Sequence, residues 1–200
     1  MKNKKTFLGL ALVFVLVMGG AAALYGRLGQ SITAEQMIVH EQQGTQAEAA
    51  ADNAASDQEE EVIPAPDFTV YDASGNPVQL STYFGKPIVL NFWASWCGPC
   101  QSEMPDFNEK YAELGDDIHF VMINMTDGGR ETIETASAFI DKNGYDFPVL
   151  FDTSSHAAMT YGAYSLPTSF FINAQGHVIA QAVGAIDGET LQRGIDMITG

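Results

Sequence analysis

Cysteine and basic residues are scarce in this 200-residue chain. The two cysteines, Cys97 and Cys100, are too few for a fold held by several disulfides or for a zinc site made of four thiolates. Nine Lys and Arg stand against 25 Asp and Glu, giving a formal net charge of −16. A chain this acidic repels phosphate groups, so we expect no nucleic-acid partner. The length allows one globular domain with some chain left over.

Histidine is also scarce, which bears on metal binding. None of the four histidines stands at metal-ligand spacing from the cysteines; they are His40, His119, His156 and His177. We therefore expect neither a bound metal nor a cofactor. Cys97 and Cys100 are too close in sequence to staple distant parts of a core, so they either react or bind something.

Charge is absent from residues 6–25, a run of twenty. As a helix this run would be about 30 Å long, which matches the hydrocarbon core of a bilayer. Three lysines precede it and an acidic stretch follows, so the rest of the chain should face outward. We assign residues 1–25 to a single transmembrane anchor, the alternative being a cleaved signal peptide. Both place the following domain outside the cytoplasm, and the lack of a cysteine after the span excludes a lipoprotein anchor.

Phe and Trp are missing from residues 26–61, which carry eight acids against Arg27. Such a segment can bury little apolar surface, so it is predicted to be an acidic flexible tether, with a composition that allows a short helix around residues 34–43. The folded domain should then occupy residues 62–200.

Strand and helix periodicities alternate along residues 62–200. Turn-rich sequences predict two hairpins, at residues 68–80 and 168–183. Continuous apolar runs predict buried strands at 88–93, 118–125 and 147–151. Apolar residues at helical spacing predict four helices, around residues 104–114, 133–140, 155–161 and 191–198. Asp187 is the expected N-cap of the last one. This alternation predicts an α/β fold.

The two cysteines stand where the strand at 88–93 gives way to a helix. The first backbone N–H groups of a helix are unpaired and the helix dipole is positive there, which stabilises a thiolate. We expect Cys97 to be the nucleophile and Cys100, one turn deeper, to be the resolving thiol that closes the disulfide. Pro99 suits the first helical turn because it lacks the N–H that would be unpaired.

Residues 65–105, APDFTVYDASGNPVQLSTYFGKPIVLNFWASWCGPCQSEMP, resemble the TlpA/ResA branch of the thioredoxin superfamily, as does the later sequence Ser165-Leu166-Pro167-Thr168. Members of this branch are membrane-anchored thiol-disulfide oxidoreductases. The resemblance covers nearly all of residues 62–200 and implies a thioredoxin-like fold with an N-terminal β-hairpin. Residues 131–152 occupy the place of the branch's central helix–strand insertion.

The resemblance also assigns residues to the site. Pro167 matches the cis-proline that faces the dithiol and leaves the backbone of Leu166 free to pair with a client peptide. Taken alone, a proline between Leu and Thr would be an ordinary trans residue at the start of a strand. Trp96 is expected to shelter the disulfide and to offer clients an apolar contact.

Glu103 matches the acid of the branch's CxxCxxE pattern. Thioredoxin carries an acid at the position of Asn91, which cannot ionise, so Glu103 is left to exchange protons with Cys100. Without the resemblance, Glu103 would be taken as a solvated residue on the helix surface.

The direction of electron flow follows from what surrounds the thiols. Gly98 and Pro99 supply no charge or side-chain donor, and Glu103 and the acidic domain oppose a thiolate, so we predict a reductant. The resemblance implies that it reduces protein disulfides outside the membrane, often those of apocytochrome c during cytochrome c maturation. No third cysteine can recharge the site, and the resemblance implies a membrane thiol transporter of the CcdA/DsbD kind as electron donor.

Other functions remain open at this stage. An oxidising compartment would also suit a disulfide oxidase or isomerase. A copper-delivery protein would pair the two thiolates with a histidine such as His156, and a peroxidase would need the PxxxTxxC setting that is absent before Cys97. A non-catalytic adhesion or scaffold module would not need both cysteines.

Overall fold

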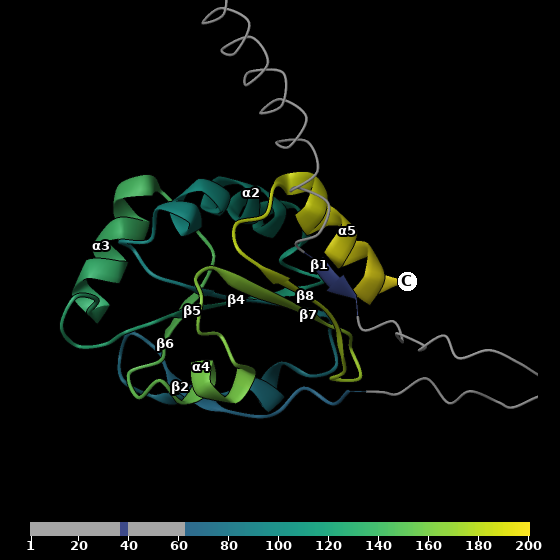
Figure 1. Cartoon of the computed structure of the whole chain (residues 1–200), viewed down its shortest axis with the longest axis horizontal. Coiled ribbons are helices and arrows are strands. Elements are labelled where there is room, and N and C mark those ends of the chain that lie inside the picture. The colour runs from purple at the N-terminus through teal and green to yellow at the C-terminus, as the bar shows by residue number, and fades with distance from the viewer. Residues whose placement is uncertain (1–36, 40–62) are drawn as a thin grey trace, which may run out of the picture. The chain divides into compact units, whose positions relative to one another are not determined.

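Figure 1 shows the computed structural model, in which residues 37–39 and 63–200 are described. The predicted anchor at residues 1–25 and most of the predicted tether at residues 26–61 lie outside the described residues. No helix in the described part has the length and apolar character that a membrane crossing requires.

The described residues form strands and helices close to those predicted. The strands are β1 Met37–Val39, β2 Thr69–Tyr71, β3 Pro77–Gln79, β4 Ile88–Trp93, β5 His119–Asn124, β6 Val149–Phe151, β7 Thr168–Ile172 and β8 Val178–Val183. The helices are η1 Leu80–Tyr83 (a 3-10 turn), α2 Gly98–Leu114, α3 Ile133–Asn143, α4 His156–Tyr161 and α5 Gly188–Thr199. Both predicted hairpins are present, as β2–β3 and β7–β8.

All of these strands belong to one mixed sheet, in the order β1-β8-β7-β4-β5-β6-β2-β3. The central strand β4 is parallel to β5 and antiparallel to β7. Every residue of β4 is buried, which explains its unbroken apolar run apart from Asn91. The carboxyl ends of β4 and β5 coincide, because Trp93 and Asn124 are paired in the register.

Helices cover both faces of the sheet. Helices α2, α3 and α5 lie on one face, and α4 lies on the other (Figure 1). Two buried apolar clusters match these layers, one including Phe107, Ala136 and Leu191 and the other including Ala157 and Tyr161. The architecture is the mixed α/β, thioredoxin-like fold that was predicted, and α3 and β6 fall where the helix–strand insertion was expected.

The segment around residues 34–43 differs from its expectation. Met37–Val39 form strand β1, antiparallel to β8, where the composition allowed a short helix. Ile and Val favour extended backbone, and β8 offers an edge of unpaired N–H and C=O groups that a three-residue strand can join. Composition alone does not reveal such an edge.

Helix termini near the site follow their sequence signals. Asp187 caps α5 as predicted, with its side chain accepting a hydrogen bond from Thr190 N. Helix α3 begins with a capping box formed by Thr132 and Thr135, and it ends at Gly144 in the left-handed conformation. These caps fix the loops that precede α3 and α5, and both loops contribute to the site described next.

Candidate active site

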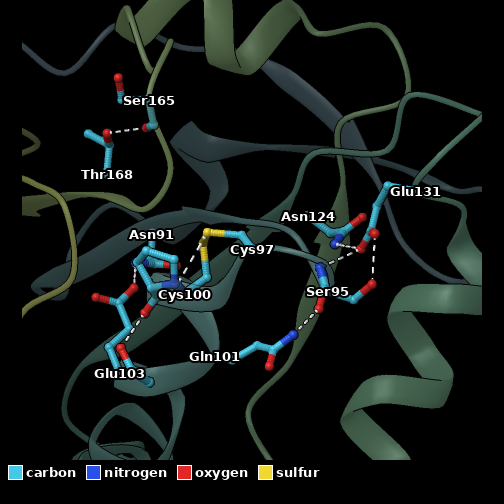
Figure 2. Close-up of a disulfide and its surroundings, with 12 residues drawn as sticks. Asn91, Ser95, Cys97, Cys100, Gln101, Glu103, Asn124, Glu131, Ser165 and Thr168 are labelled. Atoms are coloured by element: carbon cyan, nitrogen blue, oxygen red, sulfur yellow. Dashed lines mark hydrogen bonds between the residues drawn. A yellow bond between two sulfur atoms is a disulfide. The ribbon is translucent and has the colours of Figure 1, made fainter.

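The dithiol lies where β4 leads into α2. Cys97 is the N-cap of α2 and forms a disulfide with Cys100, the two Cα atoms being 5.2 Å apart (Figure 2). The Cys97 sulfur accepts a hydrogen bond from Cys100 N at 3.3 Å, and Pro99 stands in the first helical turn as predicted. Cys97 is 5% exposed and Cys100 is fully buried, so an attacking thiol reaches Cys97 first.

Glu103 is buried beneath the disulfide, one helical turn after Cys100 (Figure 2). Its Oε1 accepts a hydrogen bond from Asn91 Nδ2 at 2.8 Å, and its Oε2 accepts one from Ile186 N at 3.0 Å. Burial raises the pKa of the Glu103 carboxyl from the ordinary 4.5 to about 8, although both hydrogen bonds lower it; the negative charge of Asp106 adds a smaller rise. Glu103 is therefore not a solvated surface residue.

The segment before β7 carries the predicted cis-proline. The Leu166–Pro167 peptide bond is cis, and Pro167 is buried. Its carbonyl accepts a hydrogen bond from Gly184 N at 2.9 Å, and Thr168 Oγ1 donates to Ser165 O at 2.7 Å (Figure 2). Among the described residues, no hydrogen bond between backbone groups involves Leu166.

A groove of about 680 Å³ opens beside Cys97. Trp96 and Leu166 line it with Cys97, whereas Pro167 does not. Trp96 is 41% exposed, and the guanidinium of Arg130 lies over its ring, 3.8 Å from the ring centroid. The remaining lining residues are mostly apolar and include Met125, Ala158, Met159, Ala163 and Tyr164. The structure thus brings Trp96, Cys97 and Leu166 together around one open apolar surface, whereas Cys100, Glu103 and Pro167 do not line it.

Sequence reasoning missed a second buried carboxylate near the dithiol. Glu131 is fully buried and accepts hydrogen bonds from Ser95 N, Ser95 Oγ and Asn124 Nδ2, at 2.7–2.8 Å (Figure 2). Asn124 is a polar residue at the end of an otherwise apolar strand, which was the one available signal. Nothing in the sequence near Glu131 points to Ser95, which lies 36 residues earlier.

No group of three or more His, Cys, Asp or Glu in the described part of the chain is arranged to hold a metal ion.

Comparison with protein-family models matches residues 63–181 to the AhpC/TSA family. The thiol-disulfide oxidoreductase ResA from Bacillus anthracis is 38% identical over 138 residues, which cover 68% of this chain and 76% of that protein. The chain belongs to the ResA-type thiol-disulfide oxidoreductases of the AhpC/TSA family. ResA from Bacillus subtilis is 33% identical to this oxidoreductase, over 61% of the chain and 66% of that protein.

Solved structures agree with this assignment. A thiol:disulfide interchange protein DsbE from Chlorobium tepidum superposes on this ResA-type oxidoreductase with a TM-score of 0.62 and 33% identity, covering 70% of the chain and 97% of that structure. StoA from Bacillus subtilis superposes with a TM-score of 0.57 and 27% identity, covering 66% and 98%. The prediction of a thiol-disulfide oxidoreductase built on Cys97 and Cys100 is confirmed.

Proposed function

We propose that this oxidoreductase works as a reductant of protein disulfides outside the cytoplasm, with apocytochrome c among its clients. In this proposal the Cys97 thiolate attacks a client disulfide, forms a mixed disulfide and releases one client thiolate. Cys100 then attacks the Cys97 sulfur, which closes the Cys97–Cys100 disulfide and releases the second client thiolate. The client gains two electrons and the enzyme loses two.

The buried carboxyl of Glu103 is the observation that carries the thiol-disulfide exchange step of this proposal. Cys100 must lose its proton before it can attack, and it is fully buried, so a base inside the protein is needed. With a pKa of about 8, the Glu103 carboxyl lies close to the ordinary value of a thiol, about 8.5, so a proton passes between them at little cost. Asn91, hydrogen-bonded to Glu103, cannot take this part.

The direction of transfer rests on the lack of thiolate stabilisation. A strong oxidant holds its attacking cysteine as a stable thiolate, which favours the reduced enzyme. Here Cys97 is followed by Gly98 and Pro99, neither with a charged or donating side chain. The amides at the start of α2 are left as the main source of stabilisation. The balance favours the disulfide, as expected of a reductant.

Client binding is assigned to the groove beside Cys97. We assign the apolar contacts to Trp96 and Leu166, and the orientation of the Leu166 backbone toward an extended client segment to Pro167. The lack of backbone partners for Leu166 among the described residues supports such a pairing.

The location and the partners complete the proposal. Residues 1–25 would anchor the chain, residues 26–61 would tether the domain, and a membrane thiol transporter of the CcdA/DsbD kind would return two electrons. One similar structure is an exposed lipoprotein thioredoxin from Streptococcus pneumoniae, with a TM-score of 0.54 and 33% identity, which supports an extracytoplasmic site of action. The net charge of −16 favours basic clients.

The deciding experiment is the midpoint potential of the whole chain at pH 7 in defined thiol–disulfide buffers. We expect a value near or below about −250 mV, and a value above about −180 mV would make the protein an oxidant or isomerase. Glu103→Gln should also slow the reduction of a client disulfide, on the order of 10²-fold. Glu109→Gln, an exposed glutamate on the same helix, is the matched control and should leave the rate unchanged.

A further inference from the structure

The turn that leads into the dithiol is held by side chains from outside it. Ser95 stands two residues before Cys97, in the turn between β4 and α2. Its N–H and hydroxyl both donate to Glu131, at 2.8 and 2.7 Å, and its carbonyl accepts a hydrogen bond from Gln101 Nε2 at 2.6 Å. Every polar group of Ser95 is therefore fixed by a side chain, as Figure 2 shows.

Glu131 also ties this turn to the central sheet. Its Oε1 accepts a further hydrogen bond from Asn124 Nδ2, at 2.7 Å, at the carboxyl end of β5. Asn124 is paired with Trp93, the last residue of β4, so Glu131 closes the end of the β4–β5 ladder. Asp127 in turn accepts a hydrogen bond from Glu131 N at 2.9 Å and holds the loop that presents the carboxylate.

The cost of burying Glu131 indicates that its hydrogen bonds do more than stabilise the fold. A fully buried carboxylate is costly to desolvate, and its three hydrogen bonds from neutral donors offset that cost only when all of them are made. Such a network permits one arrangement of the turn and penalises the others. The arrangement it selects is the one in which Cys97 caps α2 and its sulfur meets Cys100.

We propose that Glu131 is a positioning residue for Cys97, acting through Ser95 to hold the Cys97 sulfur against Cys100. The measurable consequence is a high effective concentration of one thiol toward the other. This raises the equilibrium constant for forming the intramolecular disulfide, and so makes the protein more reducing. The inference rests on the proposed function, since it gives a structural reason why electrons would pass from the dithiol to the client.

Three variants of the whole chain test this positioning in a glutathione equilibrium. Glu131→Ala removes every acceptor and should shift the equilibrium about tenfold toward the reduced dithiol, which corresponds to about 30 mV for two electrons. Glu131→Gln keeps an oxygen for Ser95 N and Asn124 and offers an N–H to the Ser95 hydroxyl, so it should stay within about threefold of the wild type. Glu134→Ala, an exposed glutamate in the first turn of α3, should change nothing.

Several outcomes would overturn the proposal. If Glu131→Ala lowers the melting temperature but leaves the equilibrium constant unchanged, Glu131 is merely structural. If Glu131→Gln shifts the constant as far as Glu131→Ala, the negative charge acts and not the hydrogen bonds. Should Glu131→Ala fail to fold, Ser95→Ala carries the test with an expected shift of two- to threefold, and no shift there contradicts the proposal. A wild-type potential above −180 mV would refute the reductant proposal and still leave these differences between variants interpretable.

Discussion

Two buried glutamates flank the dithiol, and each accepts a hydrogen bond from an asparagine of a central strand (Figure 2). Glu103 is held by Asn91 of β4 on the Cys100 side, and Glu131 by Asn124 of β5 on the Cys97 side. The two pairs differ in what else binds the carboxyl. Glu103 receives one more hydrogen bond, from the backbone of Ile186, whereas Glu131 receives two more, both from Ser95.

This difference separates two uses of a buried acid. Few hydrogen bonds and deep burial give Glu103 a pKa of about 8, so it can take up and release a proton near neutral pH. Three hydrogen bonds fasten Glu131 to the turn that presents Cys97, so it is suited to holding geometry. The same residue type thus serves proton transfer on one side of the disulfide and positioning on the other.

Replacing each cysteine in turn should have the strongest effect, and it tests whether Cys97 and Cys100 have different roles. Cys97→Ser should abolish reduction of client disulfides, because the accessible sulfur is gone. In the Cys100→Ser variant, Cys97 should still attack clients, and the mixed disulfide between Cys97 and the client should accumulate because the resolving thiol is missing. Non-reducing gels with a disulfide-bonded client measure both. Client adducts that form on Cys100 in the first variant would reverse the assignment.

Glu103→Gln is expected to change the pH dependence of stability. The pKa of Glu103 is 4.5 in the unfolded chain and about 8 in the folded protein, so between these pH values the folded protein binds more protons. The free energy of unfolding of the wild type therefore falls as the pH rises from about 4.5 to 8. The variant should match the wild type near pH 4 and exceed it by up to about 3–5 kcal/mol at pH 9. Urea unfolding of the oxidised protein at both pH values measures this. A constant difference between variant and wild type would show that the carboxyl does not titrate in that range.

Asn91→Asp and Asn124→Asp should each lower the free energy of unfolding by about 1–3 kcal/mol, a smaller effect than that of Glu103→Gln. The pair compares the Glu103 side of the disulfide with the Glu131 side. Each replaces an N–H donor by a second carboxyl within hydrogen-bond distance of the glutamate, and two buried acids cannot both ionise cheaply. Glu103 binds a proton below about pH 8, so Asn91→Asp should be tolerated at pH 6 and harmful at pH 9. Asn124→Asp should also slow disulfide exchange, because it disturbs the anchoring of Ser95. Equal stability of Asn91→Asp at pH 6 and pH 9 would show that Glu103 does not exchange a proton in that range.

The smallest expected effect concerns the rim of the groove. Arg130→Ala removes the cation over Trp96 and should raise KM for a peptide client about two- to fivefold with kcat unchanged. Lys142→Ala, a neutralisation at an exposed position of α3, is the control and should leave KM unaltered. A loss in kcat for Arg130→Ala would mean that the loop acts on the chemistry as well as on binding.

Much of the fold was predictable because its signals are local. The bounds predicted for the strands at residues 88–93, 168–172 and 178–183 agree with the structure. The strand around residue 120 was predicted one residue too long at each end, because Ile118 and Met125 are apolar but lie outside the β4–β5 register, although Met125 N still donates a hydrogen bond to Trp93 O. Strand β1 was missed because its partner, β8, lies more than a hundred residues further along the chain.

The site divides in the same way. Cys97, Cys100 and Pro99 were predicted from spacing and from the physics of helix termini, and Glu103 and Pro167 from family resemblance. The grouping of Ser95 with Glu131 depends on a contact across 36 residues, and that of Glu103 with Ile186 on one across 83 residues. No local periodicity encodes such contacts.

By itself, the sequence determined the chemistry: a dithiol at the start of a helix, an acid one turn later, and an alternation of strands and helices to carry them. The tertiary structure decided how those groups behave. Burial in the core moves the pKa of Glu103 to about 8, and the joint end of β4 and β5 brings Glu131 to Ser95. The physical reason is that desolvation and hydrogen bonding depend on which distant segments cover a residue, and that is settled only when the sheet and its helices pack.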